Sequence, residues 1–389
     1  MRTRLLLGVS VLWIPLAFLF DGVTVLMLPV RLGGDATSLG LVSLVGLGIG
    51  AGLQPIAGWA SDRLRHRLDR RVFTTVAVVP ALLGLGLLAG TGSIVGAVIG
   101  YVLVQAASTS IQAGQQTLIP EHVSHVQRGR AAGLKSAFDV GGAFVAFLVL
   151  GALLAAGNLV AAAAVSAAVL VVAVVLMLVL VPRVDRTVAT IVHTRSLPPG
   201  LVPLILARFL FLFGTYAVGR FLVLLIADRL RIPADQALDE AGALLALLTL
   251  VTAAAALVFG WLADRRERTD LMVLGAVLAV AGILLLMPSG GLAGVVAGGM
   301  VMSLGTAAFM TSNWAATTDV VPRAEAGRLM AIANLGTGLA AAAAGILGPL
   351  IDAAGFAPAL LIAGAASAGA VVPLVVRLPH IHRSREHAA

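Results

Sequence analysis

Four charged side chains stand inside long apolar stretches, where a charge is costly. Asp21 and Arg220 each interrupt such a stretch, and Lys135 and Asp139 lie four positions apart in another. A charge at the centre of a membrane helix costs roughly 2.5–3.5 kcal/mol on insertion scales, so these residues are candidates for binding or moving an ion. We interpret Asp21 first and Asp139 second as carboxylates that take up and release a proton.

Each of these charges also has a simpler explanation. Asp21 and Arg220 could reach the outer head groups along the helix, which a long arginine does easily and a short aspartate does poorly. We favour a functional role for Asp21 and leave both interpretations open for Arg220. Lys135 and Asp139 share one helical face and could form an ordinary ion pair at the membrane edge. We favour that pair for Lys135, the only lysine of the chain, whereas Asp139 lies about 12 Å into the helix at 1.5 Å per residue.

Uncharged polar side chains also recur at helical spacing. They are Gln105, Thr109, Gln112 and Gln116, then Ser303, Thr306, Asn313 and Thr317 with Met310 and Trp314 close by, and finally Asn334 and Thr337. Amides and hydroxyls beside a tryptophan suit a hydroxylated neutral solute better than a large lipophilic cation. The alternative is hydrogen bonding between helices, which is commoner for Ser and Thr than for several glutamines on one helix. We predict that Gln112, Asn313, Trp314 and Asn334 line a polar path.

The composition requires that helices in lipid position these groups. Of the 389 residues, 60% are hydrophobic and only 11% are charged, against about a quarter charged in soluble domains. A bilayer core needs about 20 apolar residues per helix. Cutting the chain at charges, Pro and Gly predicts twelve membrane spans, at 5–30, 38–60, 72–90, 93–118, 131–156, 160–181, 201–227, 239–262, 270–288, 292–317, 328–350 and 357–377.

The linker and the orientation follow from polar residues between the spans. The polar, proline-bearing stretch 182–200 separates six spans from six, which predicts bundles at 1–181 and 201–377 and a tail at 378–389. Placing both termini in the cytoplasm puts 22 of the 26 basic residues inside, Arg208 among them, and only Arg31, Arg229 and Arg231 outside. The positive-inside rule therefore predicts cytoplasmic termini.

A near-repeat indicates that one bundle was duplicated. The stretch from Gly58 to Arg63 reads Gly-Trp-Ala-Ser-Asp-Arg, and the stretch from Gly260 to Arg265, 202 positions later, reads Gly-Trp-Leu-Ala-Asp-Arg. Internal repeats of membrane bundles are typical of secondary transporters, with the substrate between the halves. In such a bundle the first and seventh spans face each other across a cavity. We therefore hypothesise that Asp21 and Arg220 interact when the outer side is closed.

With this motif in both loops, the chain resembles the major facilitator superfamily over essentially its whole length. The family motif is Gly-x-x-x-Asp-Arg-x-Gly-Arg-Arg. The first copy has Gly58, Asp62, Arg63 and Arg67, and the second has Gly260, Asp264, Arg265 and Arg268, while both lack the turn glycine. The resemblance implies that the aspartate pairs with basic groups on neighbouring helices and latches a cytoplasmic gate. The alternative is that these charges only anchor and solubilise the loop.

Two further segments bear on the branch of the family. Drug–proton antiporters carry Gly-Pro-x-x-Gly-Gly in the fifth span, whereas Gly141 and Gly142 here have no preceding proline. The segments Ile119-Pro120-Glu121 and 128–134 resemble those of sugar and glycoside:cation symporters.

The sequence therefore predicts an all-α membrane protein of twelve helices in two pseudo-symmetric six-helix bundles. We expect a secondary active transporter that moves a small polar organic solute by alternating access, in symport with a proton. The alternatives are an efflux antiporter for small organic compounds or drugs, and a lipid flippase. The expected partners are a solute, a proton or other cation and the lipid bilayer, and the expected location is the cell membrane.

Other classes of function lack a signature in the sequence. Basic residues form no continuous patch, so the net charge of +8 does not predict nucleic-acid binding. Cysteine is absent, and the histidines fall in loops or the tail, so we predict no metal site. No phosphate-binding loop or nucleophile motif occurs, so we predict no enzymatic activity and no cofactor. We expect a monomer.

Overall fold

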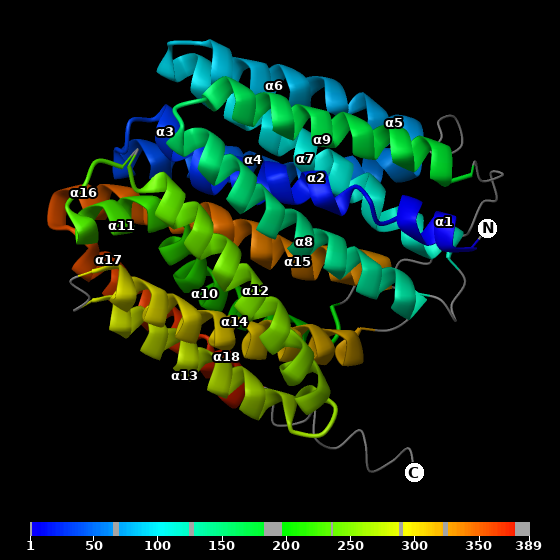
Figure 1. Ribbon diagram of the computed structural model, residues 1–389. Helices are drawn as coiled ribbons and strands as arrows, with labels where there is room; N and C mark the ends of the chain where they lie inside the picture. Colours follow the sequence, from blue (N-terminus) through cyan, green and yellow to red (C-terminus); the bar gives the residue numbers. More distant parts are fainter. Residues whose placement is uncertain are drawn as a thin grey trace. The chain divides into compact units, whose positions relative to one another are not determined.

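In the computed structural model every regular element of the described residues is a helix, as the sequence predicts. The described residues are 2–64, 70–123, 128–182, 197–234, 236–287, 291–321 and 326–377. Contacts between helices divide the chain into two compact units (Figure 1). The first unit holds the helices as far as α9 together with Leu222–Thr249, and the second holds α10 and the residues from Leu250 onward.

The first unit contains the elements of spans one to six. They are α1 (Arg2–Gly8), α2 (Trp13–Ala17), the π-helix η1 (Phe18–Met27), α3 (Leu28–Arg31), α4 (Ala36–Leu64), α5 (Arg70–Val76), α6 (Val78–Gly90), α7 (Ile94–His122), α8 (Arg128–Ala155) and α9 (Leu159–Leu180). It also contains α11 (Leu222–Leu230) and the first half of α12 (Leu238–Ala263).

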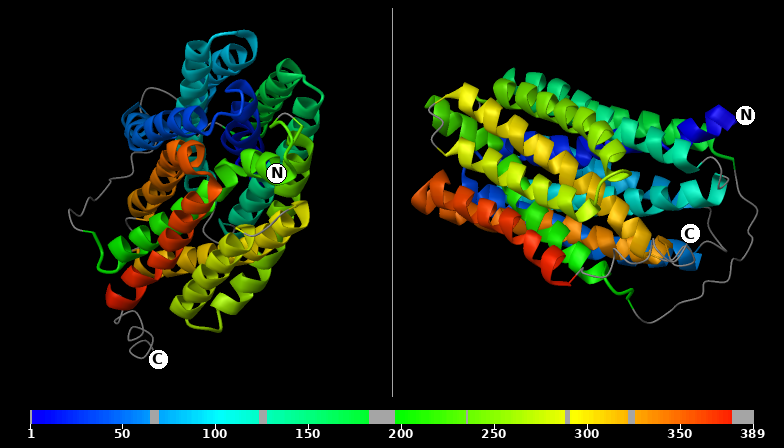
Figure 2. Two further views of the ribbon diagram at one scale, coloured as in Figure 1. Left: turned by 90° about the vertical axis from the view of Figure 1, so that its left-hand side faces the viewer. Right: turned by 90° about the horizontal axis from the view of Figure 1, so that it is seen from below.

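The second unit contains the remaining elements, with α10 (Leu201–Arg220) in contact with most of them. The others are α13 (Arg268–Leu286), α14 (Leu292–Val320), α15 (Ala326–Ala343), the 3-10 helix η4 (Ala344–Leu347), α16 (Gly348–Ala354), α17 (Phe356–Gly369) and α18 (Val371–Arg377). Figure 2 shows α13 and α14, in yellow and gold, lying side by side along their lengths.

The segment Leu222–Thr249 packs with the first unit although the sequence predicts a division at 182–200. Gly242 of α12 lies against Gly151 of α8 so closely that a Cβ on Gly151 would stand 3.0 Å from the Gly242 Cα. The two compact units are defined by packing, whereas the predicted boundary at 182–200 separates the two copies of a duplicated sequence. The two divisions therefore describe different properties. The predicted domain boundaries therefore remain a prediction.

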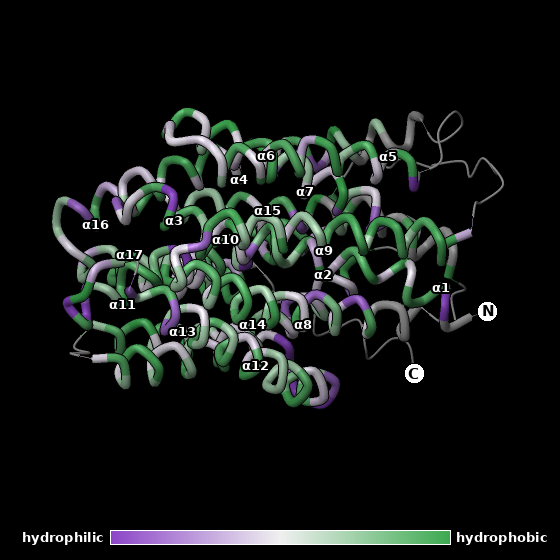
Figure 3. The backbone as a smooth tube through the Cα atoms, turned by 45° about the horizontal axis from the view of Figure 1, so that its top comes forward, coloured by the Kyte–Doolittle hydropathy of each residue, from purple (hydrophilic) through white to green (hydrophobic). Residues whose placement is uncertain are grey.

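The lengths of the helices agree with the predicted spans. Eleven helical segments are long and apolar enough to cross a membrane, and Thr74–Gly90 is a shorter apolar helix where the third span is predicted. Pro80 explains the break between α5 and α6, because proline has no N–H to bond to the carbonyl of Val76. Figure 3 shows hydrophobic residues along the helices and hydrophilic ones near their ends, for example after α12.

The first span, Arg4–Arg31, departs most from a regular helix. After Gly8 the chain makes tight turns, such as the bond from the Trp13 N–H to the Ser10 carbonyl (3.1 Å), before α2 begins. Pro15 accounts for this break, because its ring clashes with the carbonyl four residues earlier. The span then continues as the π-helix η1. This conformation is rare in proteins, but where it occurs it often lies at a functional site.

Pairs of glycines hold equivalent helices together in both units. A Cβ on Gly84 of α6 would lie 2.5 Å from the Gly100 carbonyl oxygen of α7. In the second unit a Cβ on Gly282 of α13 would lie 2.6 Å from the Gly298 carbonyl oxygen of α14. Each glycine of the second pair follows its counterpart by 198 positions. The duplication read from the loops thus extends to the helix contacts, where small residues permit close approach of two backbones.

Candidate functional site

The most buried charge in the described residues is Arg208 of α10, of which 1% is exposed. Its Nε donates to the Asn313 Oδ1 (2.7 Å) and its Nη2 to the Thr317 hydroxyl (3.3 Å), both on α14. Its Nη1 donates to the Ala333 carbonyl of α15 (3.4 Å). The guanidinium carbon lies 4.5 Å from the centre of the Trp314 ring, within range of a cation–π contact.

No carboxylate lies within ion-pair distance of Arg208 in the part of the chain that the structure describes. Its charge is instead stabilised by uncharged groups, namely the amide, hydroxyl, carbonyl and indole ring described above. Arginine tolerates such a setting better than lysine because its charge is delocalised and weakly hydrated. The Asn313 amide also donates to the Leu204 carbonyl (3.1 Å), so the asparagine bridges two parts of α10.

The sequence analysis counted Arg208 among the basic residues of the cytoplasmic side, and the structure shows that its side chain is buried among helices. Arg208 lies inside the span Leu201–Arg220, about 10 Å from its start at 1.5 Å per residue. The side chain points to α14, where Asn313 and Thr317 stand one turn apart. A charge inside a predicted span is itself the signal that points to Arg208, as it is for Arg220.

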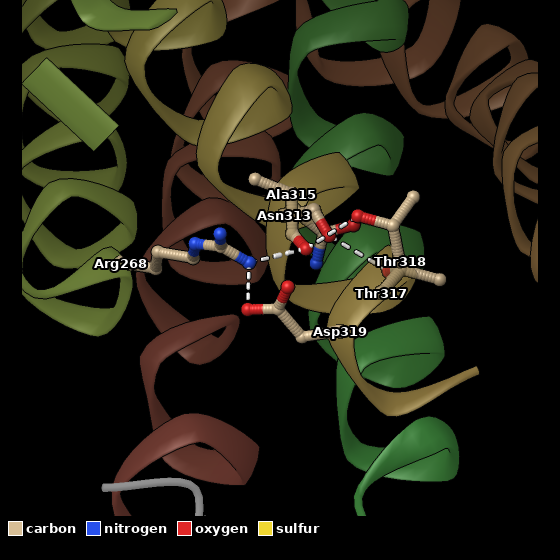
Figure 4. Close-up of polar contacts among 6 residues, drawn as sticks. All are labelled: Arg268, Asn313, Ala315, Thr317, Thr318 and Asp319. Atoms are coloured by element: carbon tan, nitrogen blue, oxygen red, sulfur yellow. Dashed lines mark hydrogen bonds and ion pairs between the residues drawn. The ribbon is translucent and has the colours of Figure 1, made fainter. Parts of the chain in front are cut away.

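A second arginine, Arg268, contacts the same stretch of α14 (Figure 4). Arg268, at the first residue of α13, pairs through Nη1 with the Asp319 carboxylate and donates to the Ala315 carbonyl. Thr318 donates its hydroxyl to the same carbonyl (2.8 Å). Residues 313–319 of α14 therefore fasten arginines from two different helices. The sequence motif supplied Arg268, but its partner Asp319 was not predicted.

The other predicted gate residues of this loop are arranged differently. Arg265 lies over the Trp261 ring, 3.7 Å from its centre. Asp264 is exposed and makes no hydrogen bond or ion pair with any residue that the structure describes. A Cβ on Gly260 would make only ordinary contact with Thr311, at 3.6 Å, so close helix packing does not require this glycine. The role of these residues as a gate remains a prediction.

The first copy of the motif lies at the end of α4. Gly58, Asp62 and Arg63 belong to this helix, but their side chains are outside the described structure, as is Arg67 entirely. Their predicted role is therefore also untested.

Arg220 ends α10 in a setting unlike that of Arg208. Only 5% of the residue is exposed, and its Nη2 donates to the Ala341 carbonyl of α15 (3.1 Å). Its Nε and Nη1 are buried and have no hydrogen-bond partner among the residues that the structure describes. Arg220 belongs to the second unit and Asp21 to the first, so the predicted interaction between them remains a prediction.

Asp21 is half-buried within the π-helix η1, one turn before a buried polar cluster. In that cluster the Thr24 hydroxyl lies 3.1 Å from the Tyr101 hydroxyl and accepts from the Gln105 amide (2.9 Å). Both partners are on α7, so these bonds tie the first span to the fourth. Gly46 leaves room for the Tyr101 ring, since a Cβ there would overlap it. Sequence spacing had marked Gln105 but not Thr24 or Tyr101.

The predicted polar stripe of α7 divides between two environments. Gln105 and Thr109 are buried within the first unit, whereas Gln112 is half-buried and accepts from the Gln54 amide of α4 (3.0 Å). Gln115, which lies off the stripe, is buried and donates to the Val9 carbonyl. Gln105 and Gln112 of this stripe thus take part in hydrogen bonds between helices, and the role of Gln112 in a polar path remains a prediction.

The remaining predicted site residues are half-buried. The Lys135 ammonium of α8 stands 3.8 Å from the centre of the Trp13 ring of α2, and Asp139 lies one turn further along α8. Asn334 of α15 and Trp314 of α14 are also half-buried. Asn313, by contrast, is fully buried against Arg208. No cluster of His, Cys, Asp and Glu suited to a metal occurs in the described ranges.

These observations define a multi-span membrane protein whose helices carry buried cations and amides. The model of the Major Facilitator Superfamily matches residues 14–238 and, a second time, residues 204–388. The chain belongs to this superfamily. The family match and the described helices together confirm the predicted twelve-helix fold.

Solved structures with the same fold cover almost the whole chain. A bacterial homologue of the human lysosomal transporter Spinster, inward-facing and occupied, has a TM-score of 0.74 at 15% identity and covers 97% of this chain and 95% of its own. The nucleoside transporter NupG, as a point mutant, has 0.72 at 15%, covering 96% and 100%. An inward-facing bacterial homologue of the iron transporter ferroportin has 0.66 at 18%, covering 96% and 97%. No curated protein matches the sequence.

Proposed function

We propose that this protein is a secondary active transporter that moves a small polar organic solute across the cell membrane by alternating access, in symport with a proton. Membership of the superfamily supports transport of a small solute. The similar structures are named for a lysosomal transporter, a nucleoside transporter and an iron transporter, so the fold is compatible with unrelated cargoes. The solute and the coupling must therefore be argued from the residues of this chain.

The observation that carries the proton coupling is the position of Asp21. It is an ionisable group within a membrane span, in the π-helical segment η1 that also carries Thr24, which bonds to Tyr101 and Gln105. Ionisable residues inside membrane spans are rare and mark ion pathways. Asp139, one turn from Lys135 on α8, is the second candidate for carrying the proton.

The gate of the proposed cycle is formed by both copies of the loop motif. Charged groups at the ends of α4 and α12 break and re-form their pairs as the cytoplasmic mouth opens and closes. The pair between Arg268 and Asp319 supports this role, because it joins one copy of the motif to α14 through a bond at the membrane edge. We also propose that the protein acts as a monomer with both termini in the cytoplasm, as the excess of arginine on that side favours.

Uptake into liposomes tests the function. The purified full-length protein is reconstituted, and entry of labelled neutral and acidic sugars is measured with and without an alkaline interior. We expect accumulation only with the gradient, and Asp21→Asn should reduce uptake to the gradient-free level because the amide cannot carry a proton. Asp270→Asn is the matched control, since Asp270 is exposed in the first turn of α13.

The outcomes separate the competing functions. Accumulation that ignores the gradient, or an Asp21→Asn variant that keeps its gradient dependence, contradicts proton symport through this residue. Gradient-driven release instead of uptake would identify an efflux antiporter. Movement of fluorescent lipid between leaflets without solute uptake would identify a flippase.

A further inference from the structure

Arg220 carries hydrogen-bond donors that nothing in the described structure uses. The side chain is almost fully buried, and its Nε and Nη1 have no partner. A buried donor without a partner costs about 1–3 kcal/mol, and more when it is charged. Because the side chain is buried against α15 and only Nη2 has a partner among the described residues, the cost calls for a compensating ligand.

The geometry of the guanidinium shows what kind of ligand fits. The group has five N–H bonds in a rigid fork, and one of them, on Nη2, points to the Ala341 carbonyl. Nη2 has a second N–H, so one edge of the guanidinium keeps two parallel donors whichever edge faces Ala341. Two parallel N–H groups match the two oxygens of a carboxylate or phosphate.

The surroundings supply only partial negative charge. Arg220 is the last residue of α10, and the Ala341 carbonyl that accepts from it lies near the end of α15, where the chain continues into η4. A carbonyl oxygen carries a partial negative charge only. No carboxylate lies within 4 Å of Arg220 among the described residues. The Ala341 carbonyl therefore holds the arginine in place without neutralising its charge.

Arg208 shows that this chain can supply a hydrogen-bond partner for every nitrogen of a buried guanidinium. Its Nε, Nη1 and Nη2 all have partners on α14 or α15. Arg220 is on the same helix, is buried to a similar degree and has one hydrogen bond. Arg208 therefore links helices, whereas Arg220 has N–H groups that remain available to bind a ligand.

We propose that Arg220 binds an oxyanion of the transported solute, a carboxylate or a phosphate, through the open edge of its guanidinium. This inference rests on the proposed function and narrows its substrate class: the polar solute is an organic anion and not a neutral one.

Anion-dependent stabilisation tests the site without requiring transport. The purified full-length protein is heated in detergent with acetate, inorganic phosphate or short-chain phosphatidic acid, each compared with chloride at equal ionic strength. Acetate or phosphate should raise the unfolding temperature of the wild type in a saturable manner. Arg220→Gln should weaken the apparent affinity about tenfold to a hundredfold, because charge-assisted hydrogen bonds are lost. Arg220→Lys should lie between, since lysine keeps the charge but not the fork.

Arg266→Gln is the control, because Arg266 carries the same charge at an exposed position of the loop after α12. Its response to the anions should equal that of the wild type. The site is refuted if chloride stabilises the wild type as well as acetate and phosphate do, or if Arg220→Gln and Arg220→Lys respond like the wild type. If only phosphatidic acid stabilises the protein, the ligand of Arg220 is a lipid head group and not a transported solute.

The result is distinguishable from failure of the proposed function. If proton-driven uptake fails while acetate or phosphate still stabilises through Arg220, the anion site stands and the symport mechanism falls. If uptake of neutral sugars is driven by the gradient while anions have no effect, the transport function stands and the anion site falls.

Discussion

Two arginines of one helix show that the residue type alone does not determine what a buried side chain does. Arg208 and Arg220 both lie in α10 and are both buried, yet one is held by side chains of α14 and the other by a single carbonyl of α15. The difference lies in what the neighbouring helices present at each level. Asn313 and Thr317 stand one turn apart, so both face the same guanidinium.

Asn313 should therefore matter for stability as well as for any transport role. Asn313→Ala removes the acceptor for the Arg208 Nε, which leaves a buried charged donor without that partner, and it also removes a second donor to the Leu204 carbonyl. We expect a loss of about 2–4 kcal/mol of unfolding free energy, seen as a lower midpoint of thermal unfolding. Thr306→Ala is the control, because the Thr306 hydroxyl bonds only to Met302 of its own helix (2.9 Å). Equal effects of the two changes would contradict this account.

At the scale of helices, glycine sets how closely the spans approach. The pairs Gly84 with Gly100 and Gly282 with Gly298 bring two backbones together at equivalent places in the two units. Lipid tails are as apolar as leucine, so helices in a membrane gain little from hiding apolar side chains from one another. Backbone contact across small residues replaces that gain. A duplicated sequence therefore keeps its glycines at such crossings.

A single methyl group tests this arrangement. Gly84→Ala places a Cβ 2.5 Å from the Gly100 carbonyl oxygen, so α6 and α7 must separate, and we expect destabilisation by about 1–3 kcal/mol. Gly86→Ala on the same helix meets nothing within 4 Å. That control should be neutral or slightly stabilising, because alanine favours a helix over glycine by up to about 1 kcal/mol. Thermal unfolding of both purified variants measures the difference, and matching midpoints would refute the packing role of Gly84.

At the scale of the whole molecule, the distribution of charge predicts how the chain lies in the membrane. Arg31 is one of the few basic residues predicted outside, and it donates to the Thr91 and Ser93 carbonyls in the loop between α6 and α7. The loop after α12 carries Arg265 and Arg266 and is predicted inside. The two loops should therefore face opposite sides of the membrane.

Thiol labelling checks this orientation directly, because the chain has no cysteine of its own. Ser93→Cys should react with a membrane-impermeant maleimide in intact cells. Arg266→Cys should react only after the cells are made permeable. The reverse pattern would mean that the termini face outward, and labelling of both in intact cells would mean that one of the loops lies on a different side than predicted.

Much of the architecture follows from the sequence because lipid imposes a simple rule. Every backbone polar group in the bilayer must be bonded internally, so long apolar segments become helices whatever their neighbours. The twelve spans were therefore predictable from hydropathy and breaks at charges. The repeated loop motif predicted the duplication, and the glycine pairs of α6–α7 and α13–α14 agree with it.

The site was less predictable, since a helical stripe shows which residues share a face but not what lies opposite. Gln105 and Gln112 share the stripe on α7, yet one bonds to Thr24 of the first span and the other to Gln54 of α4. The π-helix around Asp21 likewise has no signature in the residue pattern. The Arg208 setting required the approach of α14 and α15, and Asp319 became a partner only through the packing of α13.

The sequence by itself thus determined the class of protein, the number of spans, the repeat and the charges that lipid makes costly. Only the tertiary structure decided which of those charges are satisfied, as Arg208 is, and which keep free donors, as Arg220 does. The physical reason is range. Hydrophobicity and helix formation are properties of a local segment, whereas a hydrogen bond between helices depends on two side chains meeting within about 3 Å after the whole bundle has packed.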